Sequence, residues 1–129
     1  MEVKFALDTN RLTDFLRGLE EVVEKVGSAE RVFVPAIVLG EMRSGFMAGT
    51  KAAANETRLT QFLAARRVEV LHVEEQTSFH YALIFAGLRK RGTPIPQNDL
   101  WIAALVFQHA LPLYTRDAHF RQMPELRLV

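Results

Sequence analysis

Cysteine is absent from this chain of 129 residues, which excludes disulfide bonds and thiolate zinc sites. No apolar run approaches the roughly 20 residues of a membrane span; the longest extends from Leu100 to Phe107. The first residues, Met-Glu-Val-Lys-Phe-Ala-Leu-Asp, do not resemble a signal peptide, because acidic residues interrupt a short apolar segment and no cleavage-like site follows. These absences predict a cytoplasmic protein with no membrane partner.

A strong charge of either sign is also lacking. The chain has 16 Lys and Arg residues against 15 Asp and Glu residues, a net charge of +1. Bulk charge therefore gives no argument for a nucleic-acid partner, and local patches or bound cations would have to attract one. Hydrophobic residues at 49% and charged residues at 24% are typical of a globular protein. With no repeat or linker in view, we expect one domain spanning residues 1–129.

Short apolar segments alternate with segments of helical periodicity. Strands are expected at residues 3–7, 32–34, 68–73 and 113–115, and the sequence leaves a fifth strand at 126–129 open. Helices are expected from a cap at Thr9 or Asn10 to Gly18, and at residues 20–26, 35–43, 51–67, 77–91 and 98–109. This alternation predicts an α/β sandwich around a mostly parallel sheet of four to five strands.

Four acidic residues fall where such a sheet gathers ligands. Asp8 directly follows the first expected strand, and Asp117 comes two residues after the fourth. Glu41 lies about two turns into the helix after the second strand, and Asp99 opens a helix that is otherwise apolar. Because ligands collect at the carboxyl ends of parallel strands, we expect these four side chains to share one edge of the sheet.

Each acid also has an ordinary structural explanation. Asp8 and Asp117 suit turns or helix caps, Asp99 is favoured by the helix dipole, and Glu41 could be solvated. Four carboxylates at one edge, however, raise one another's pKa unless a cation lies among them. Oxygen ligands without cysteine or paired histidine suit Mg²⁺ or Mn²⁺. Such an ion can polarise a phosphate oxygen and activate water, which is the chemistry of phosphodiester hydrolysis.

Four motifs in order carry a family resemblance that spans nearly the whole chain. They are "ALDTN", "VPAIVLGEMRSG", "NDLWIAA" and "YTRDAHF", which contain the four acids in turn. With these motifs the chain resembles the PIN-domain ribonucleases, specifically the VapC-type toxins of toxin–antitoxin pairs. The segment from Met47 to Glu75 carries no motif, so there the resemblance is one of length and helix pattern only.

The resemblance implies a PIN-like three-layer α/β/α sandwich whose acidic pocket holds one or two Mg²⁺ or Mn²⁺ ions. The acids that would line this pocket are Asp8, Glu41, Asp99 and Asp117. Polar positions beside them could orient carboxylates or waters: Thr9, Asn10, Asn98 and Thr115. Asn10 and Asn98 could instead cap helices, and Thr115 could merely fit a strand end. Arg43 and Arg116 could contact phosphate, or be solvated or ion-paired.

The function implied is a metal-dependent endoribonuclease toxin of a type II toxin–antitoxin system, in which a metal-activated water attacks RNA. The same resemblance implies a homodimer and a small VapB-like antitoxin whose C-terminal segment fills the acidic groove. Two alternatives stay open, a catalytically inactive PIN-fold binding module and a receiver-like phosphoacceptor domain. The receiver alternative is disfavoured because Asp8 has no second acid beside it.

The remaining candidate residues have structural explanations. None of the histidines has the i, i+4 spacing of a helical zinc site, so we expect structural or solvated roles for His72, His80, His109 and His119. His119 alone is of interest, because it lies two residues after Asp117. Trp101 is expected in the core or in a subunit contact.

Overall fold

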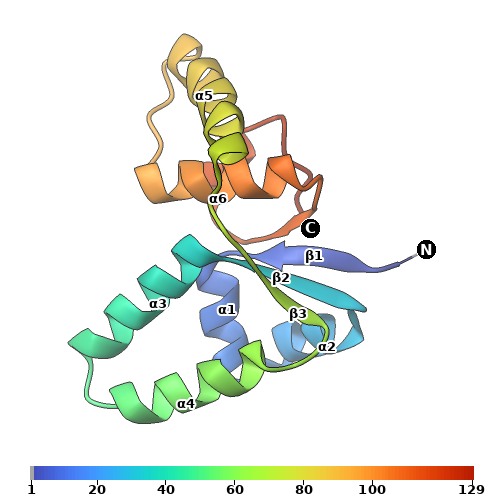
Figure 1. Ribbon diagram of the computed structural model, residues 1–129, viewed down its shortest axis with the longest axis vertical. Coiled ribbons are helices and arrows are strands. Elements are labelled where there is room, and N and C mark those ends of the chain that lie inside the picture. The colour runs from blue at the N-terminus through green and yellow to red at the C-terminus, as the bar shows by residue number, and fades with distance from the viewer. Residues whose placement is uncertain (1) are drawn as a thin grey trace.

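A computed structural model describes residues 2–129 of the chain. This part of the chain contains four strands, six α-helices and a short 3₁₀-helix (Figure 1). In chain order they are β1 (Lys4–Leu7), α1 (Thr9–Leu16), α2 (Glu20–Ser28), β2 (Arg31–Pro35), α3 (Ala36–Ala48), α4 (Ala52–Leu63), β3 (Val68–Leu71), α5 (Glu75–Lys90), α6 (Gln97–Gln108), β4 (Leu113–Tyr114) and η1 (Ala118–Gln122). No helix among these residues combines the length and apolar character needed to cross a bilayer.

The strands form one sheet in the order β3-β2-β1-β4, and every pairing is parallel. Ala6 of β1 pairs with Phe33 of β2 on one side and with Leu113 of β4 on the other. The fifth strand does not form, because β4 has only two residues and offers little ladder to extend. A single parallel bridge joins Leu113 to Leu128 instead.

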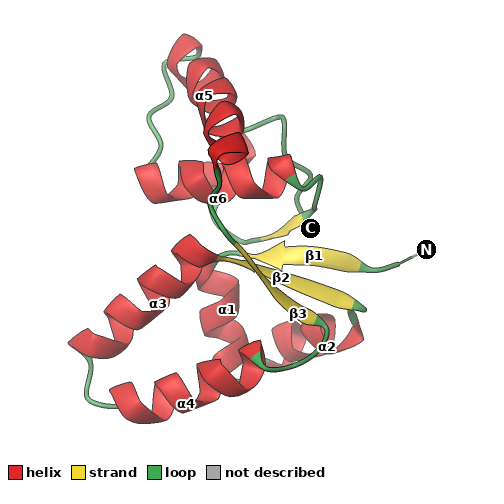
Figure 2. Ribbon diagram, viewed as in Figure 1, coloured by secondary structure: helices red, strands yellow, loops and turns green. Residues whose placement is uncertain are grey.

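Helices cover both faces of the sheet. The pair α5 and α6 lies on one side, and α1, α2, α3 and α4 lie on the other (Figures 1 and 2). The two inner strands are apolar and buried along nearly their whole length, as expected for a parallel sheet covered on both sides; β1 is buried from Phe5 to Leu7 and β2 from Val32 to Pro35. The edge strand β3 is buried only at its two end residues. The predicted three-layer α/β/α sandwich is confirmed.

Helix α6 is buried on most of its circumference. Leu100 and every residue from Ile102 to Val106 are buried, because the helix packs against α5, α3, β2 and η1. Trp101 stacks on Tyr81 of α5 with ring centroids 4.1 Å apart. Trp101 is only partly buried and does not belong to the core, so the expected core position is wrong and a subunit contact stays a prediction.

Several element boundaries differ from those expected. Helix α3 continues through Gly45 and ends at Ala48, since one glycine costs a helix only about 1 kcal/mol. Helix α4 ends at Leu63 and not at residue 67, because the following turn brings Arg67 to backbone carbonyls. Its guanidinium donates to the oxygens of Val26 and Ala29 at 2.6 and 2.9 Å. Strand β3 ends at residue 71, where its partner β2 also ends.

Replacing Leu105 by alanine should destabilise the protein by about 2–5 kcal/mol, because its side chain is fully buried in α6 and truncation leaves a cavity. Urea unfolding measures this change. The matched control is Val23→Ala on α2, where the side chain is 40% exposed, and its effect should stay within about 0.5 kcal/mol. Equal losses for the two variants would contradict the central position of α6.

Candidate active site

The four predicted carboxylates line one pocket at the carboxyl edge of the sheet. The pocket has a volume of about 270 Å³, and Asp8, Glu41, Asp99 and Asp117 all contribute to its wall. Asp8 follows β1, Glu41 lies on α3 after β2, Asp117 follows β4, and Asp99 lies in the first turn of α6. The parallel direction of the strands thus brings together residues that are far apart in the sequence.

Asp8 is the most buried of the four, with 3% of its surface exposed. It caps α1, because its Oδ1 accepts a hydrogen bond from the backbone N of Arg11 at 2.9 Å. The expected cap at Thr9 or Asn10 is therefore wrong by one or two residues. Its other oxygen, Oδ2, accepts a hydrogen bond from the hydroxyl of Thr115.

Burial raises the pKa of Asp8 above its ordinary value, and the nearby charge of Asp117 raises it further. The hydrogen bonds from Thr115 and Arg11 lower the pKa, but they do not cancel the effect of burial. The ionised carboxylate is therefore held at a cost to the fold, and a cation in the pocket would offset that cost.

Two threonines fix the carboxylates. Thr9 donates from its hydroxyl to Oε1 of Glu41 at 2.5 Å, which joins α1 to α3. Thr115 donates to Asp8 and accepts from the backbone N of Asp117 at 2.9 Å, so one hydroxyl links two of the acids. Both residues have the contacts of groups that orient ligands.

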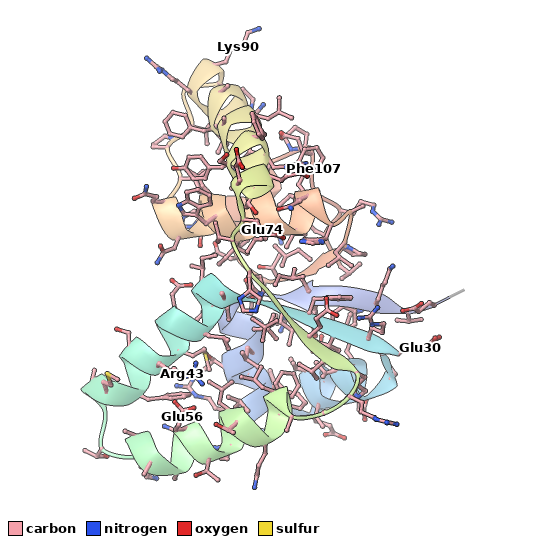
Figure 3. The ribbon with its side chains drawn as sticks, viewed as in Figure 1. Glu30, Arg43, Glu56, Glu74, Lys90 and Phe107 are labelled. Atoms are coloured by element: carbon pink, nitrogen blue, oxygen red, sulfur yellow. The ribbon has the colours of Figure 1, made fainter. Side chains whose placement is uncertain are left out.

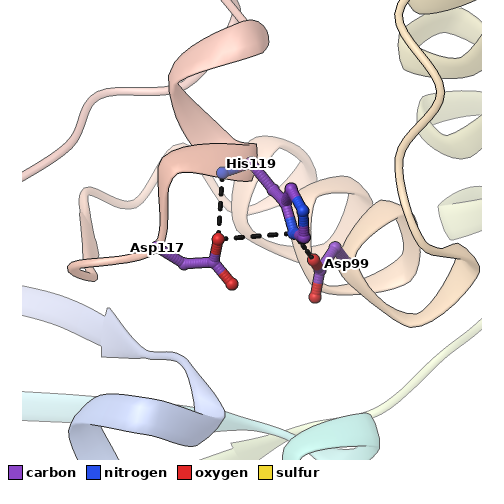
Figure 4. A group of neighbouring side chains, drawn as sticks. All are labelled: Asp99, Asp117 and His119. Carbon is purple, nitrogen blue, oxygen red and sulfur yellow. Dashed lines mark hydrogen bonds and ion pairs between the residues drawn. The ribbon is translucent and has the colours of Figure 1, made fainter.

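Asp99, Asp117 and His119 form a close group on one side of the pocket (Figure 4). Asp117 caps η1 by accepting from the backbone N of His119 at 2.9 Å. Nδ1 of the His119 ring lies 2.8 Å from Oδ2 of Asp99 and 3.3 Å from Oδ1 of Asp117. One ligand atom from each residue lies within 4.8 Å of the other two.

His119 therefore lines the acidic pocket, whereas the sequence predicted a structural or solvated role for it. The two-residue separation from Asp117 is the signal that points to it. Burial raises the pKa of Asp99, and the charges of Asp117 and Glu41 raise it further, while the hydrogen bond with His119 lowers it. The pocket therefore carries concentrated negative charge, and its hard oxygen donors fit a divalent cation.

The two asparagines of the prediction lie at the edge of the acidic pocket or beside it. Asn10 lines the acidic pocket, but its side chain is exposed. Asn98 is also exposed, and it borders a neighbouring hollow that it shares with Glu41. Helix α6 begins at Gln97 after Pro96, with no side-chain cap, so Asn98 does not cap it.

Both arginines proposed as phosphate contacts are ion-paired. Arg43 on α3 donates from Nε and a terminal nitrogen to Glu56 on α4, at 2.8 and 3.1 Å (Figure 3). Arg116 donates in the same way to Asp14 on α1, at 2.9 and 3.3 Å. Neither arginine lines the acidic pocket, so the geometry favours the ion-paired alternative for both.

The Arg116–Asp14 pair ties the site together. Arg116 lies between Thr115 and Asp117, and Asp14 is buried on the helix that begins at Asp8, with 8% of its surface exposed. The hydrogen bond from Arg116 holds the pKa of Asp14 below its ordinary value. The pair therefore clamps the loop after β4 against α1.

The PIN domain family matches residues 5–126 of this sequence. A relative, ribonuclease VapC4 of Mycobacterium tuberculosis, is 32% identical over 96 residues, which cover 74% of each chain. The chain belongs to the PIN-domain family and, within it, to the VapC ribonucleases. A receiver-like phosphoacceptor domain is accordingly set aside.

Other relatives are similar to this PIN domain over nearly its whole length. The tRNA(fMet)-specific endonuclease VapC of Salmonella typhimurium is 27% identical over 129 residues, covering 98% of this chain and 96% of that protein. Among solved structures, the DNA-bound VapBC of Salmonella typhimurium gives a TM-score of 0.89 at 27% identity, covering 98% and 97% of the two chains. VapBC-1 of nontypeable Haemophilus influenzae gives 0.85 at 25% identity, with coverage of 98% and 96%.

Breaking the clamp with Arg116→Gln should destabilise the PIN domain by about 1 kcal/mol at neutral pH, a modest loss because the arginine is half exposed to water. A carboxyl with a lowered folded pKa stabilises above its unfolded pKa, and this contribution is lost as pH falls through the folded value. The difference between wild type and variant should therefore shrink as the pH falls below the ordinary pKa of a carboxyl, about 4. Urea unfolding at several pH values measures it, and a gap that widens in acid would refute the clamp.

Replacing Asp8 by asparagine should raise the melting temperature by a few degrees in chelator at neutral pH. A carboxyl whose folded pKa is raised destabilises the fold when ionised, and neutral asparagine removes that charge while still capping α1. Added Mg²⁺ or Mn²⁺ should stabilise the wild type and not the variant. Differential scanning fluorimetry measures both effects. A lower melting temperature for the variant in chelator would show that the carboxylate itself stabilises the fold.

Proposed function

We propose that this chain is a single-domain, metal-dependent endoribonuclease, the toxin of a type II toxin–antitoxin system. The observation that carries the proposal is the convergence of Asp8, Glu41, Asp99 and Asp117 on one pocket, where burial and mutual repulsion raise the pKa of two of them. Family membership with the VapC ribonucleases supports the same reaction. The proposed cofactor is one or two Mg²⁺ or Mn²⁺ ions, and the proposed substrate is RNA in the cytoplasm.

In the proposed reaction, the carboxylates act as metal ligands and two threonines hold them in position. The four carboxylates hold the ion, and one of them accepts the proton of the attacking water. When bound, the ion polarises the scissile phosphate and activates that water. Thr9 holds Glu41 and Thr115 holds Asp8, so that the carboxylate oxygens keep their directions. The products would carry a 3′-hydroxyl and a 5′-phosphate.

Two protein partners belong to the proposal. The similar structures from Salmonella typhimurium and Haemophilus influenzae are VapBC, which supports a small VapB-like antitoxin here. An Arg or Lys of its C-terminal segment would enter the acidic groove and compete with the metal. A homodimer is supported by apolar side chains exposed on α5, where Phe79 is 70% and Leu83 is 59% exposed.

Purified protein incubated with mixed RNAs should cleave them with Mg²⁺ or Mn²⁺ and stop when a chelator is added. Asp8→Asn should lower the cleavage rate by at least about 100-fold, because it removes a proposed metal ligand. The matched control is Glu30→Gln, an exposed acid at the amino-terminal end of β2, away from the site (Figure 3). Its cleavage rate should equal that of the wild type. Gel electrophoresis of end-labelled RNA measures all three proteins, with DNA as a parallel substrate.

The alternatives give different outcomes. Cleavage that persists in chelator or in Asp8→Asn would refute the metal mechanism. Cleavage of DNA alone would refute the RNA assignment. Absence of cleavage of any nucleic acid by a folded wild type would favour a catalytically inactive PIN-fold binding module. In cells, induced expression should arrest growth, and the neighbouring antitoxin gene should relieve the arrest.

A further inference from the structure

His119 places an imidazole nitrogen among carboxylate oxygens. The pocket is otherwise built from oxygen donors, and the ring faces Asp99 and Asp117 rather than solvent alone (Figure 4). Its position is fixed by its neighbours in the chain. Asp117 accepts from its backbone N, and Phe120 and Met123 are each 1% exposed and anchor η1 in the core.

Two of the separations between these atoms are close to those between neighbouring ligands of one ion, and all three atoms lie within 4.8 Å of one another. Two neighbouring ligands at about 2.1 Å from an octahedral cation lie about 3.0 Å apart. Nδ1 of His119 lies 2.8 Å from Oδ2 of Asp99 and 3.3 Å from Oδ1 of Asp117. A single cation placed between these three atoms could therefore contact all of them after a small rearrangement of the side chains.

We propose that His119 is a ligand of the metal in this pocket and that it makes the site prefer a first-row transition-metal ion, such as Mn²⁺, over Mg²⁺. The proposal rests on the proposed function and specifies its cofactor. Mg²⁺ is a hard cation that takes oxygen ligands and binds imidazole weakly. First-row transition-metal ions accept an imidazole nitrogen more readily, with an affinity that rises from Mn²⁺ through Fe²⁺ and Co²⁺ to Ni²⁺. One nitrogen among several oxygens thus adds affinity for Mn²⁺ and little for Mg²⁺.

A different role would leave a different signature. His119 could act only as a positive counter-charge for Asp99, occupying the place of a cation. Its removal would then strengthen the binding of both ions, because a competitor is lost, and the ratio of their dissociation constants would stay unchanged. The ratio therefore separates a ligand from a counter-charge.

The test uses the whole protein without RNA. Isothermal titration calorimetry with Mn²⁺ and with Mg²⁺ gives both dissociation constants for the wild type, His119→Asn and His109→Asn. The last variant is the matched control, because His109 is exposed at the opposite end of α6 from Asp99. His119→Asn should weaken Mn²⁺ binding by about 10–100-fold and Mg²⁺ binding by less than about threefold. His109→Asn should change neither.

Pulsed electron paramagnetic resonance of Mn²⁺ bound to the wild type should detect hyperfine coupling to an imidazole nitrogen. This measurement needs no variant, so it decides the question even if His119→Asn folds poorly. A Mn²⁺-loaded wild type without nitrogen coupling, or an unchanged ratio of dissociation constants in a folded His119→Asn, would overturn the proposal. Nitrogen coupling in a protein that cleaves no RNA would support the ligand and refute the proposed function.

Discussion

Parallel pairing of β1 with both β2 and β4 is the constraint on which the rest of the structure depends. Because all strands point the same way, each strand ends at the same edge, and the residues that follow them meet there. Asp8 follows β1, an inner strand of the sheet, which explains why it is the most buried acid. Glu41 and Asp117 reach it from the strands on either side. An antiparallel β4 would carry Asp117 to the opposite edge and leave no pocket.

The ionised carboxylates of the pocket lower the stability of the folded protein. Burial and neighbouring charges raise the pKa values of Asp8 and Asp99, so ionised carboxylates there oppose folding. Hydrogen bonds from Thr115 and from the start of α1 reduce this cost without removing it. In the proposed function, a cation bound in the pocket would offset this cost and so stabilise the folded protein.

Residue positions alone were enough to predict the sheet and the meeting of the four acids, because the rule for parallel strands needs only the order of the elements. Contacts that depend on turn geometry were not accessible in this way. His119 faces Asp99 only because η1 turns the chain after Asp117. Arg116 and Asp14 form an ion pair although they are 102 residues apart in the sequence, and no local sequence pattern predicts that pair. Gly45 lies inside α3 because the contacts of this helix with α1 and α4 outweigh the weak helix propensity of one glycine.

The site depends on both ends of the described chain. Thr115 and Asp117 follow β4, which has two residues and lies at the edge of the sheet. So short a strand is held in part by the segment after η1, since the N of Leu113 donates to the oxygen of Arg127 at 2.8 Å and the N of Val129 donates to the oxygen of Leu113 at 2.9 Å. The clamp from Arg116 to Asp14 fixes the other end of the loop. Residues that touch none of the four pocket carboxylates therefore help to determine where Thr115 and Asp117 lie.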